Sequence, residues 1–178
     1  MLGVIPLVID SCLEELRNSF SKEYDDYKPL LERCRALLFT EIENNPKNIH
    51  AVCLIAMVEF ELRVETEIVL GYLEEAYTKY KDQISGEDFS MLATDMAYFY
   101  IEECENKEDE SAALLQEAVK RGSTYPETYY ALGLLHYEND RYKKACRCSK
   151  APAGFPRILN TDMPMPCASL NVAMRMIQ

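Results

Sequence analysis

The sequence predicts an all-α fold. Apolar residues recur every three or four positions along most of the 178-residue chain, and this spacing places them on one face of a helix. Only six Gly and eight Pro are present, too few for the many tight turns of a β-sandwich or a doubly wound α/β sheet. With 48% hydrophobic and 28% charged residues, the composition is that of a globular domain with its own core.

About eight helices follow from these apolar stripes and from the residues that interrupt them. Asp10 or Ser11 can cap the first helix, and Asn45–Pro46 ends the second because proline cannot continue a helix. Ser85–Gly86 separates the fourth helix from the fifth, and Gly122 ends the sixth. Short polar connections predict that neighbouring helices run antiparallel, as hairpins. The first expected helix carries Leu13, Leu16 and Phe20, and the second carries the apolar residues between Leu30 and Ile42. The others cover roughly residues 48–63, 65–82, 87–103, 109–120, 125–138 and a last stretch from Arg141.

The hairpins share a pattern of small and large residues. Residues 127–145 read ETYYALGLLHYENDRYKKA, with Leu132–Gly133 in the first expected helix and with Tyr142 and Ala145 in the second. This segment resembles the tetratricopeptide repeat, whose first helix carries an aromatic residue and Leu-Gly and whose second carries Tyr and Ala. Tyr129 stands where the family usually has Trp. The small residue allows two helices to approach closely while large ones fill the space beside the contact.

Weaker copies of this pattern lie upstream. Ala97 and Ala118 occupy successive helices in a manner that resembles the Sel-like variant of the family, and residues 102–110 would be the longer connection between them. The resemblance covers roughly residues 44–145, with Pro6–Glu43 as a divergent repeat or a cap. It implies a right-handed solenoid of antiparallel helical hairpins that serves as a scaffold for protein or peptide binding.

The charge balance predicts the kind of partner. Nineteen Lys and Arg against thirty Asp and Glu give a net charge of −11, which argues against nucleic acid or an anionic membrane surface and favours a basic or amphipathic protein or peptide. No apolar run approaches the length of a membrane span, and the first ten residues lack the features of a signal peptide. Seven scattered Cys without dense spacing indicate a reducing, cytoplasmic compartment.

Motifs for catalysis or cofactor binding are absent from the sequence. No glycine-rich nucleotide loop, zinc-protease motif, serine-hydrolase elbow or EF-hand loop occurs, so we expect neither an enzyme nor a cofactor. The family's first-helix Tyr would fall on His136, one of only two His. One alternative is a small metal-binding protein or enzyme that uses His136 with Cys146 and Cys148, and Cys167 could complete a zinc set. The spacing lacks a CxxC pair, so we expect no metal site.

Aromatic residues supply the candidate recognition surface. The chain has twelve Tyr, six Phe and no Trp, and Tyr buries a large area while keeping a hydroxyl for hydrogen bonding. In the family, the first helices of the hairpins line a concave face. One alternative is that these aromatic residues only pack between helices. Another is that the chain is a purely structural part of a longer repeat protein. Carrying the family's register across implies contact with a partner through Met57, Phe60, Thr94, Tyr98, Tyr130, Leu134 and Tyr137.

The composition changes near the end of the chain. Residues 1–149 carry sixteen basic and twenty-nine acidic residues, whereas residues 150–178 carry three basic and one acidic and hold four of the eight Pro. Pro152 would end the last helix early. We therefore expect a repeat domain over residues 1–149 and an atypical tail over 150–178, which is either non-native sequence or a cap in which Met and Leu residues cover the last hairpin.

Overall fold

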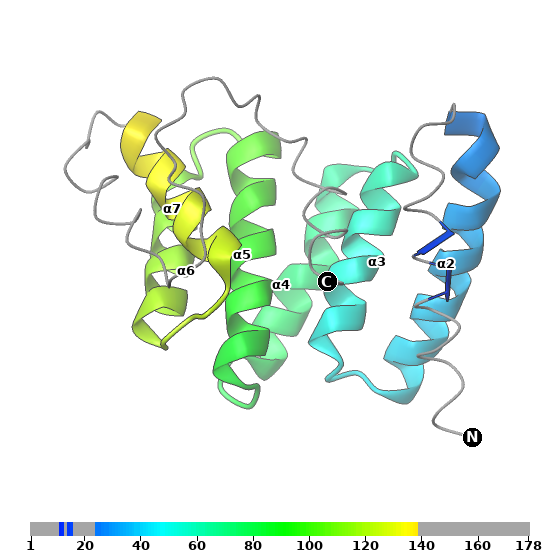
Figure 1. Cartoon of the computed structure of the whole chain (residues 1–178), viewed down its shortest axis with the longest axis horizontal. Coiled ribbons are helices and arrows are strands. Elements are labelled where there is room, and N and C mark those ends of the chain that lie inside the picture. The colour runs from blue at the N-terminus through cyan, green and yellow to red at the C-terminus, as the bar shows by residue number, and fades with distance from the viewer. Residues whose placement is uncertain (1–10, 13, 16–23, 139–178) are drawn as a thin grey trace. The chain divides into compact units, whose positions relative to one another are not determined.

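The fold is all-helical in the part of the chain that the computed structural model describes, residues 11–12, 14–15 and 24–138. No strand occurs in these ranges, so the predicted fold class is confirmed. Ser11, Cys12, Glu14 and Glu15 are helical, while the helix expected from Arg141 and the tail lie outside the described residues. The six helices of residues 24–138 are α2 (Tyr24–Asn44), α3 (Ile49–Glu61), α4 (Thr66–Tyr80), α5 (Gly86–Glu103), α6 (Glu108–Lys120) and α7 (Pro126–Glu138) (Figure 1).

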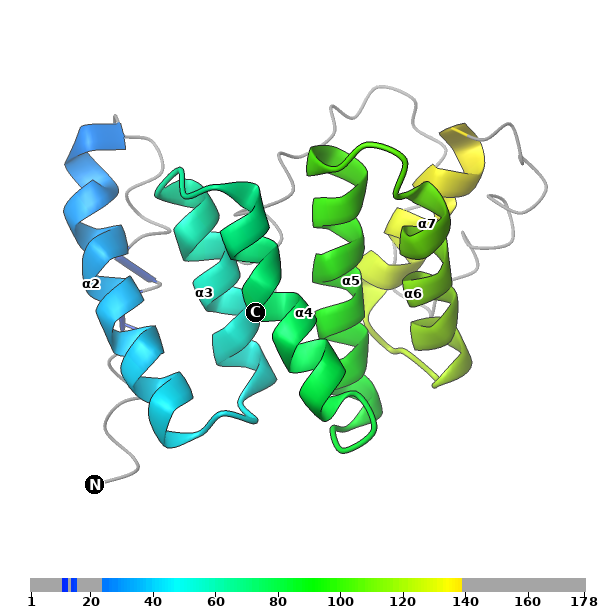
Figure 2. The ribbon, with the colours of Figure 1, turned by 180° about the vertical axis from the view of Figure 1, so that it is seen from behind.

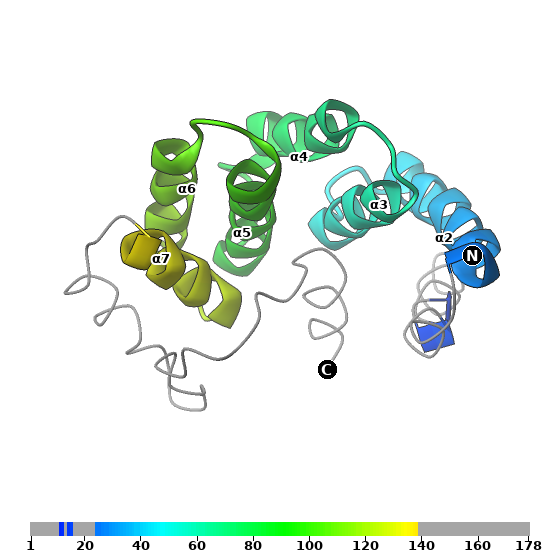
Figure 3. The ribbon, with the colours of Figure 1, turned by 90° about the horizontal axis from the view of Figure 1, so that it is seen from above.

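Contacts divide the chain into two compact units, and the division falls inside α4, between Ala76 and Tyr77. In the first unit, α2 packs against α3, and the two helices run antiparallel. In the second, α5 and α6 form an antiparallel hairpin (Figure 2). Helix α7 contacts both α5 and α6 (Figure 3). Each unit thus contains an antiparallel pair of neighbouring helices of the kind expected from the sequence.

Local signals set the ends of the helices where the sequence predicts them. Asn48 caps α3, because its side-chain oxygen accepts a hydrogen bond of 3.2 Å from the Ala51 amide. Ser85 caps α5 in the same way, with a bond of 3.0 Å from the Asp88 amide. Gly122 follows α6 with a φ of +84°, a left-handed conformation that suits glycine and closes the helix end.

Helix α3 has almost no solvent-exposed face. All residues from Ala51 to Glu59 are buried, as expected for a helix that is apolar nearly all round. Leu31, Cys34 and Leu38 of α2 pack against it in the apolar cluster of the first unit. The polar ends of the two helices are also joined, since the Asn48 side-chain amide donates a hydrogen bond of 2.9 Å to the Glu41 carboxylate.

The second unit has small residues in its buried interior. Ala97 on α5, Ala118 on α6 and Ala131 on α7 are each fully buried. Gly133 of α7 is buried as well. Large apolar residues of this unit, such as Phe89 and Leu115, are fully buried too. The small and large residues of the predicted pattern are therefore both part of the buried interior of this unit.

The cysteines of the described ranges are all free thiols. Cys12, Cys34 and Cys53 are buried and behave as small apolar residues. Cys104 is different, because it is the residue that follows α5, in extended conformation and half-buried. The acidic connection after it holds Asn106 in the left-handed region, so the chain turns there rather than continuing the helix.

Candidate interaction surface

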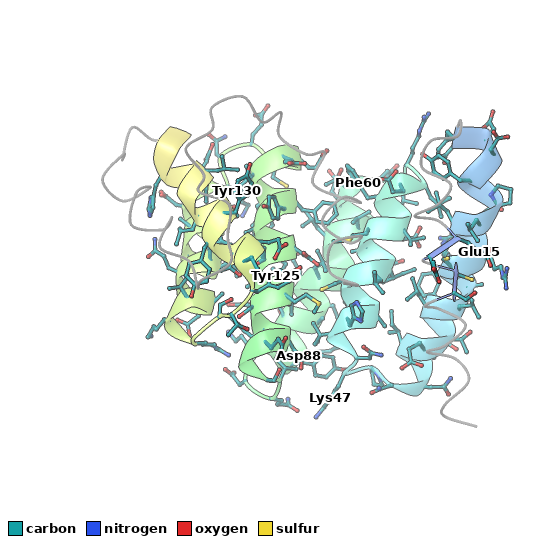
Figure 4. All side chains as sticks on the ribbon, viewed as in Figure 1. Glu15, Lys47, Phe60, Asp88, Tyr125 and Tyr130 are labelled. Atoms are coloured by element: carbon teal, nitrogen blue, oxygen red, sulfur yellow. The ribbon has the colours of Figure 1, made fainter. Side chains whose placement is uncertain are left out.

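The seven predicted contact residues lie in both units and differ in exposure. Phe60 of α3 is half-buried near the end of its helix, and Tyr130 of α7 is half-buried as well (Figure 4). Tyr98 of α5 and Leu134 of α7 are half-buried. Tyr137 lies in α7, but its side chain is outside the described part of the structure. The remaining two residues, Met57 and Thr94, are buried.

Burial of Met57 and Thr94 corrects the expectation that both line a contact surface. Met57 is 4% exposed and belongs to the apolar cluster between α2 and α3. Thr94 is fully buried, and its hydroxyl lies 2.8 Å from the hydroxyl of Thr128 on α7. The register borrowed from the repeat family therefore points these two side chains into the packed interior, where a partner cannot reach them.

A chain of hydroxyl groups joins α5 to the start of α7. The Thr128 hydroxyl also lies 3.2 Å from the Ser123 hydroxyl, which in turn accepts a hydrogen bond of 3.1 Å from the Tyr125 amide. Tyr129 donates a hydrogen bond of 2.7 Å to the carbonyl oxygen of Ser123. The loop before α7 is thereby held against α5, and the Tyr at the position usual for Trp performs a structural role.

Tyr98 and Tyr130 are brought together on neighbouring helices. Burial raises the pKa of Tyr98 above its usual range, and the negative charge of nearby groups raises that pKa further. The groups that act on it are Tyr130, Glu127, Asp95 and Glu102, in order of decreasing effect. The two tyrosines therefore share an environment of carboxylates from both α5 and α7. We call Tyr98, Glu102, Glu127 and Tyr130, which are exposed or half-buried, the tyrosine–carboxylate surface, and Asp95 lies buried beside Tyr98.

The three carboxylates around Tyr98, those of Asp95, Glu102 and Glu127, are not among the residues that the sequence predicts for the site. Asp95 is 2% exposed although it carries a carboxylate, and one carboxylate oxygen of Glu127 is buried. Helical spacing could have pointed to them, because Asp95 precedes Tyr98 by three positions and Glu127 precedes Tyr130 by three. Such pairs lie side by side on one helix face. Composition alone did not separate these acids from the many exposed ones.

A second polar cluster lies within the first unit. Arg35 of α2 forms an ion pair of 2.8 Å with Glu59 of α3, whose side chain is completely buried. The Arg35 guanidinium also lies 5.6 Å from the ring centre of Phe39. Phe39 meets Tyr72 of α4 edge to face, with ring centres 5.9 Å apart. Desolvation raises the pKa of Tyr72, and the charge of Glu59 adds to the effect. This cluster joins α2, α3 and α4 through side chains.

The residues of the metal-binding alternative are only partly visible. His136 is 7% exposed within α7, while Cys146, Cys148 and Cys167 lie outside the described residues. Among the described residues, no three His, Cys, Asp or Glu side chains are grouped so that they could hold a metal ion. No helix in residues 24–138 has the length and apolar character needed to cross a membrane.

Comparison with known proteins gives only distant structural similarities. No protein-family model matches the sequence, and no curated protein matches it. Two crystal structures of MamA are similar in the course of the backbone. The first has a TM-score of 0.49 and 17% identity, covering 73% of this chain and 72% of that one. The second has a TM-score of 0.47 and 15% identity, covering 84% of this chain and 72% of the other.

Proposed function

We propose that this chain is a protein-interaction scaffold without catalysis of its own, and that α5 and α7 carry its contact surface. The observation that supports this proposal is the pairing of Tyr98 with Tyr130 among the carboxylates of Asp95, Glu102 and Glu127. Tyrosine is well suited to a contact surface because it buries much area with little loss of side-chain entropy. The helical hairpins supply a rigid base for it.

We propose a partner that presents basic side chains on a helix or an extended peptide. The tyrosine–carboxylate surface is acidic, and residues 77–138 as a whole carry thirteen acidic and five basic residues. A Lys or Arg side chain placed there would gain both charge attraction and contact with the face of a Tyr ring. The same argument disfavours DNA and acidic peptides, because like charges repel them.

The other predicted contact residues have different parts in this proposal. Leu134 lies four positions after Tyr130 on α7, so it extends the same helix face with an apolar contact. Thr94 supports the surface from inside by holding α7 against α5. Phe60 belongs to the first unit and would form a separate apolar contact near the end of α3, whereas Met57 remains part of the apolar cluster of that unit. Tyr137 would prolong the α7 face beyond Leu134.

Binding of a designed peptide pair tests the proposal. The full chain is titrated with a lysine-rich amphipathic peptide and with a glutamate-rich peptide of the same length and apolar pattern, and fluorescence anisotropy reports binding. We expect only the lysine-rich peptide to bind, with an affinity that falls as salt rises because salt screens the charges. Equal binding of both peptides, or binding that does not respond to salt, contradicts the proposed partner chemistry.

Point variants then locate the surface. Tyr98→Ala and Tyr130→Ala should each weaken binding of the lysine-rich peptide by about tenfold or more, as truncation of a central contact residue does. Tyr80→Ala is the matched control, because Tyr80 is also a half-buried Tyr of a helix but lies at the end of α4. Circular dichroism confirms that each variant remains folded. Unchanged binding by both α5 and α7 variants places the contact elsewhere.

A further inference from the structure

Two cysteines meet where the N-terminal helical residues lie against α2. Cys12 is fully buried and Cys34 is 1% exposed, and both are free thiols. They belong to one apolar cluster, together with Leu31 and Leu38 of α2. The two side chains are near neighbours in this cluster, since Cys12 acts directly on the pKa of Cys34.

A separate ion pair also holds the N-terminal helical residues against α2 beside the two cysteines. Glu15 and Arg33 approach to 3.8 Å between a carboxylate oxygen and a guanidinium nitrogen. Glu15 follows Cys12 by three positions, so both side chains lie on the same side of a helical turn. Arg33 immediately precedes Cys34 in α2. Figure 4 shows Glu15 beside α2. Two neighbouring contacts thus hold the N-terminal turn in one register against this helix.

We propose that Cys12 and Cys34 are an oxidisable thiol pair, which closes to a disulfide when a glutathione-type disulfide is in excess and so fastens the N-terminal turn to α2. In the first step, the thiolate of one cysteine attacks a sulfur atom of the oxidised glutathione, and one glutathione thiolate leaves. In the second, the other cysteine attacks the mixed disulfide and displaces the second glutathione. Two protein thiols are oxidised, one glutathione disulfide is reduced to two thiols, and no other reactant is needed.

Burial controls when this reaction can occur. Burial, together with charge and hydrogen bonding from the neighbouring Cys12, raises the pKa of Cys34 to about 12. The reactive thiolate is therefore scarce while the turn stays closed, so exchange requires local opening of the N-terminal turn. Once one cysteine carries glutathione, the closeness of the other makes ring closure faster than attack by a second glutathione. The two thiols stay reduced in a reducing compartment, and the disulfide forms when the ratio of oxidised to reduced glutathione rises.

Peptide mapping of the full chain tests the proposal. The protein is incubated in buffers with increasing ratios of oxidised to reduced glutathione, free thiols are alkylated under acid quench, and fragments are identified by mass spectrometry. We expect a monomeric product in which the fragments that contain Cys12 and Cys34 are joined and lighter by two hydrogen atoms. A low concentration of urea should accelerate closure, since it favours local opening. The closed form should also melt at a higher temperature than the reduced form, and dithiothreitol should reverse the shift.

Matched variants separate this pair from the other cysteines. Cys34→Ser should abolish both the joined fragment and the rise in melting temperature, whereas Cys104→Ser should leave both unchanged, because Cys104 lies at the end of α5. The wild-type map alone is decisive where Cys34→Ser fails to fold. Glutathione retained on Cys12 or Cys34, a link from either one to a different cysteine, or free thiols at both positions in urea under the most oxidising buffer would each overturn the proposal.

Discussion

The guanidinium carbon of Arg121 lies 3.7 Å from the centre of the Phe89 ring, so the residue that ends α6 covers the first buried aromatic residue of α5. The same side chain donates a hydrogen bond of 2.7 Å to the carbonyl oxygen of Lys81 and one of 3.0 Å to the Glu117 carboxylate. One residue therefore fastens the loop between α4 and α5 to the far end of the α5–α6 hairpin.

Replacing Arg121 should loosen this junction. We expect Arg121→Ala to lower the free energy of unfolding by about 2 kcal/mol, because it removes a stacked cation and a hydrogen bond to the backbone together. Lys120→Ala is the control: its ammonium lies 3.5 Å from Glu117, but the side chain is 80% exposed. That change should cost less than about 0.5 kcal/mol. Urea unfolding followed by circular dichroism measures both, and equal effects would show that the stacked geometry contributes nothing.

The buried ion pair between Arg35 and Glu59 should behave as a coupled unit. Arg35→Met leaves the buried Glu59 carboxylate without its cation, and we expect a loss of about 2 kcal/mol in the free energy of unfolding. The double variant Arg35→Met/Glu59→Leu should be more stable than the single Arg35 variant, since it removes the stranded charge as well. A double-mutant cycle by chemical denaturation supplies the coupling energy. Strictly additive effects would mean that the pair is not coupled.

Two glycines in helices should respond in opposite ways to an added side chain. Gly133 is buried in α7, so Gly133→Leu forces extra volume into a helix contact and should cost about 2 kcal/mol. Gly71 is exposed in α4, and a Cβ there meets no atom within 4 Å. Gly71→Ala should therefore raise stability by about 0.5–1 kcal/mol, the usual gain in helix propensity. Thermal and urea unfolding compare them, and a tolerated Leu at 133 would place that residue away from any close contact.

Tyr98 should make stability fall at alkaline pH. Its pKa is raised in the folded protein above the ordinary 10.0, chiefly by burial. The folded state thus keeps the proton while the unfolded state loses it, so the free energy of unfolding is constant with respect to this group below about pH 9 and declines above pH 10. Urea unfolding at several pH values should show a steeper alkaline decline for the wild type than for Tyr98→Phe. Parallel pH curves would argue against a buried, proton-retaining Tyr98.

The tail beyond Ser149 gives a further test. A chain that ends at Ser149 should keep the unfolding midpoint of the full chain, because we predict that residues 150–178 lie outside the repeat domain. A loss of more than about 2 kcal/mol on deletion would instead identify the tail as a cap that covers apolar surface. Differential scanning calorimetry on both proteins distinguishes these outcomes.

Local chemistry explains which features could be predicted from the sequence. Signals at helix ends act only on the few residues next to them. The end of α2 before Asn45–Pro46, the start of α5 after Ser85 and the end of α6 before Gly122 therefore lie close to the predicted positions. Contacts between distant residues could not be derived in this way. The hydroxyl pair of Thr94 and Thr128 and the bond from Arg121 to Lys81 depend on how whole helices pack.

The candidate site illustrates the same limit. Periodicity identified the first helices of the hairpins, and Tyr98 and Tyr130 do come together. It could not tell which side of α5 faces solvent, because apolar and polar residues are both buried along that helix. The register carried across from the repeat family predicts Thr94 at the surface although it lies inside, and that register does not point to Asp95, which lies beside Tyr98.

The buried helix α3 has a consequence for how the first unit exchanges its amide protons with solvent. Since the residues from Ala51 to Glu59 have no exposed side, fraying of a surface cannot bring their amides into contact with deuterium. Their exchange has to wait for opening of the whole unit, whereas the exposed ends of α2 and α4 can exchange through small local fluctuations. The exchange rates of the slowest amides among residues 51–59 therefore report on the unfolding of the first unit.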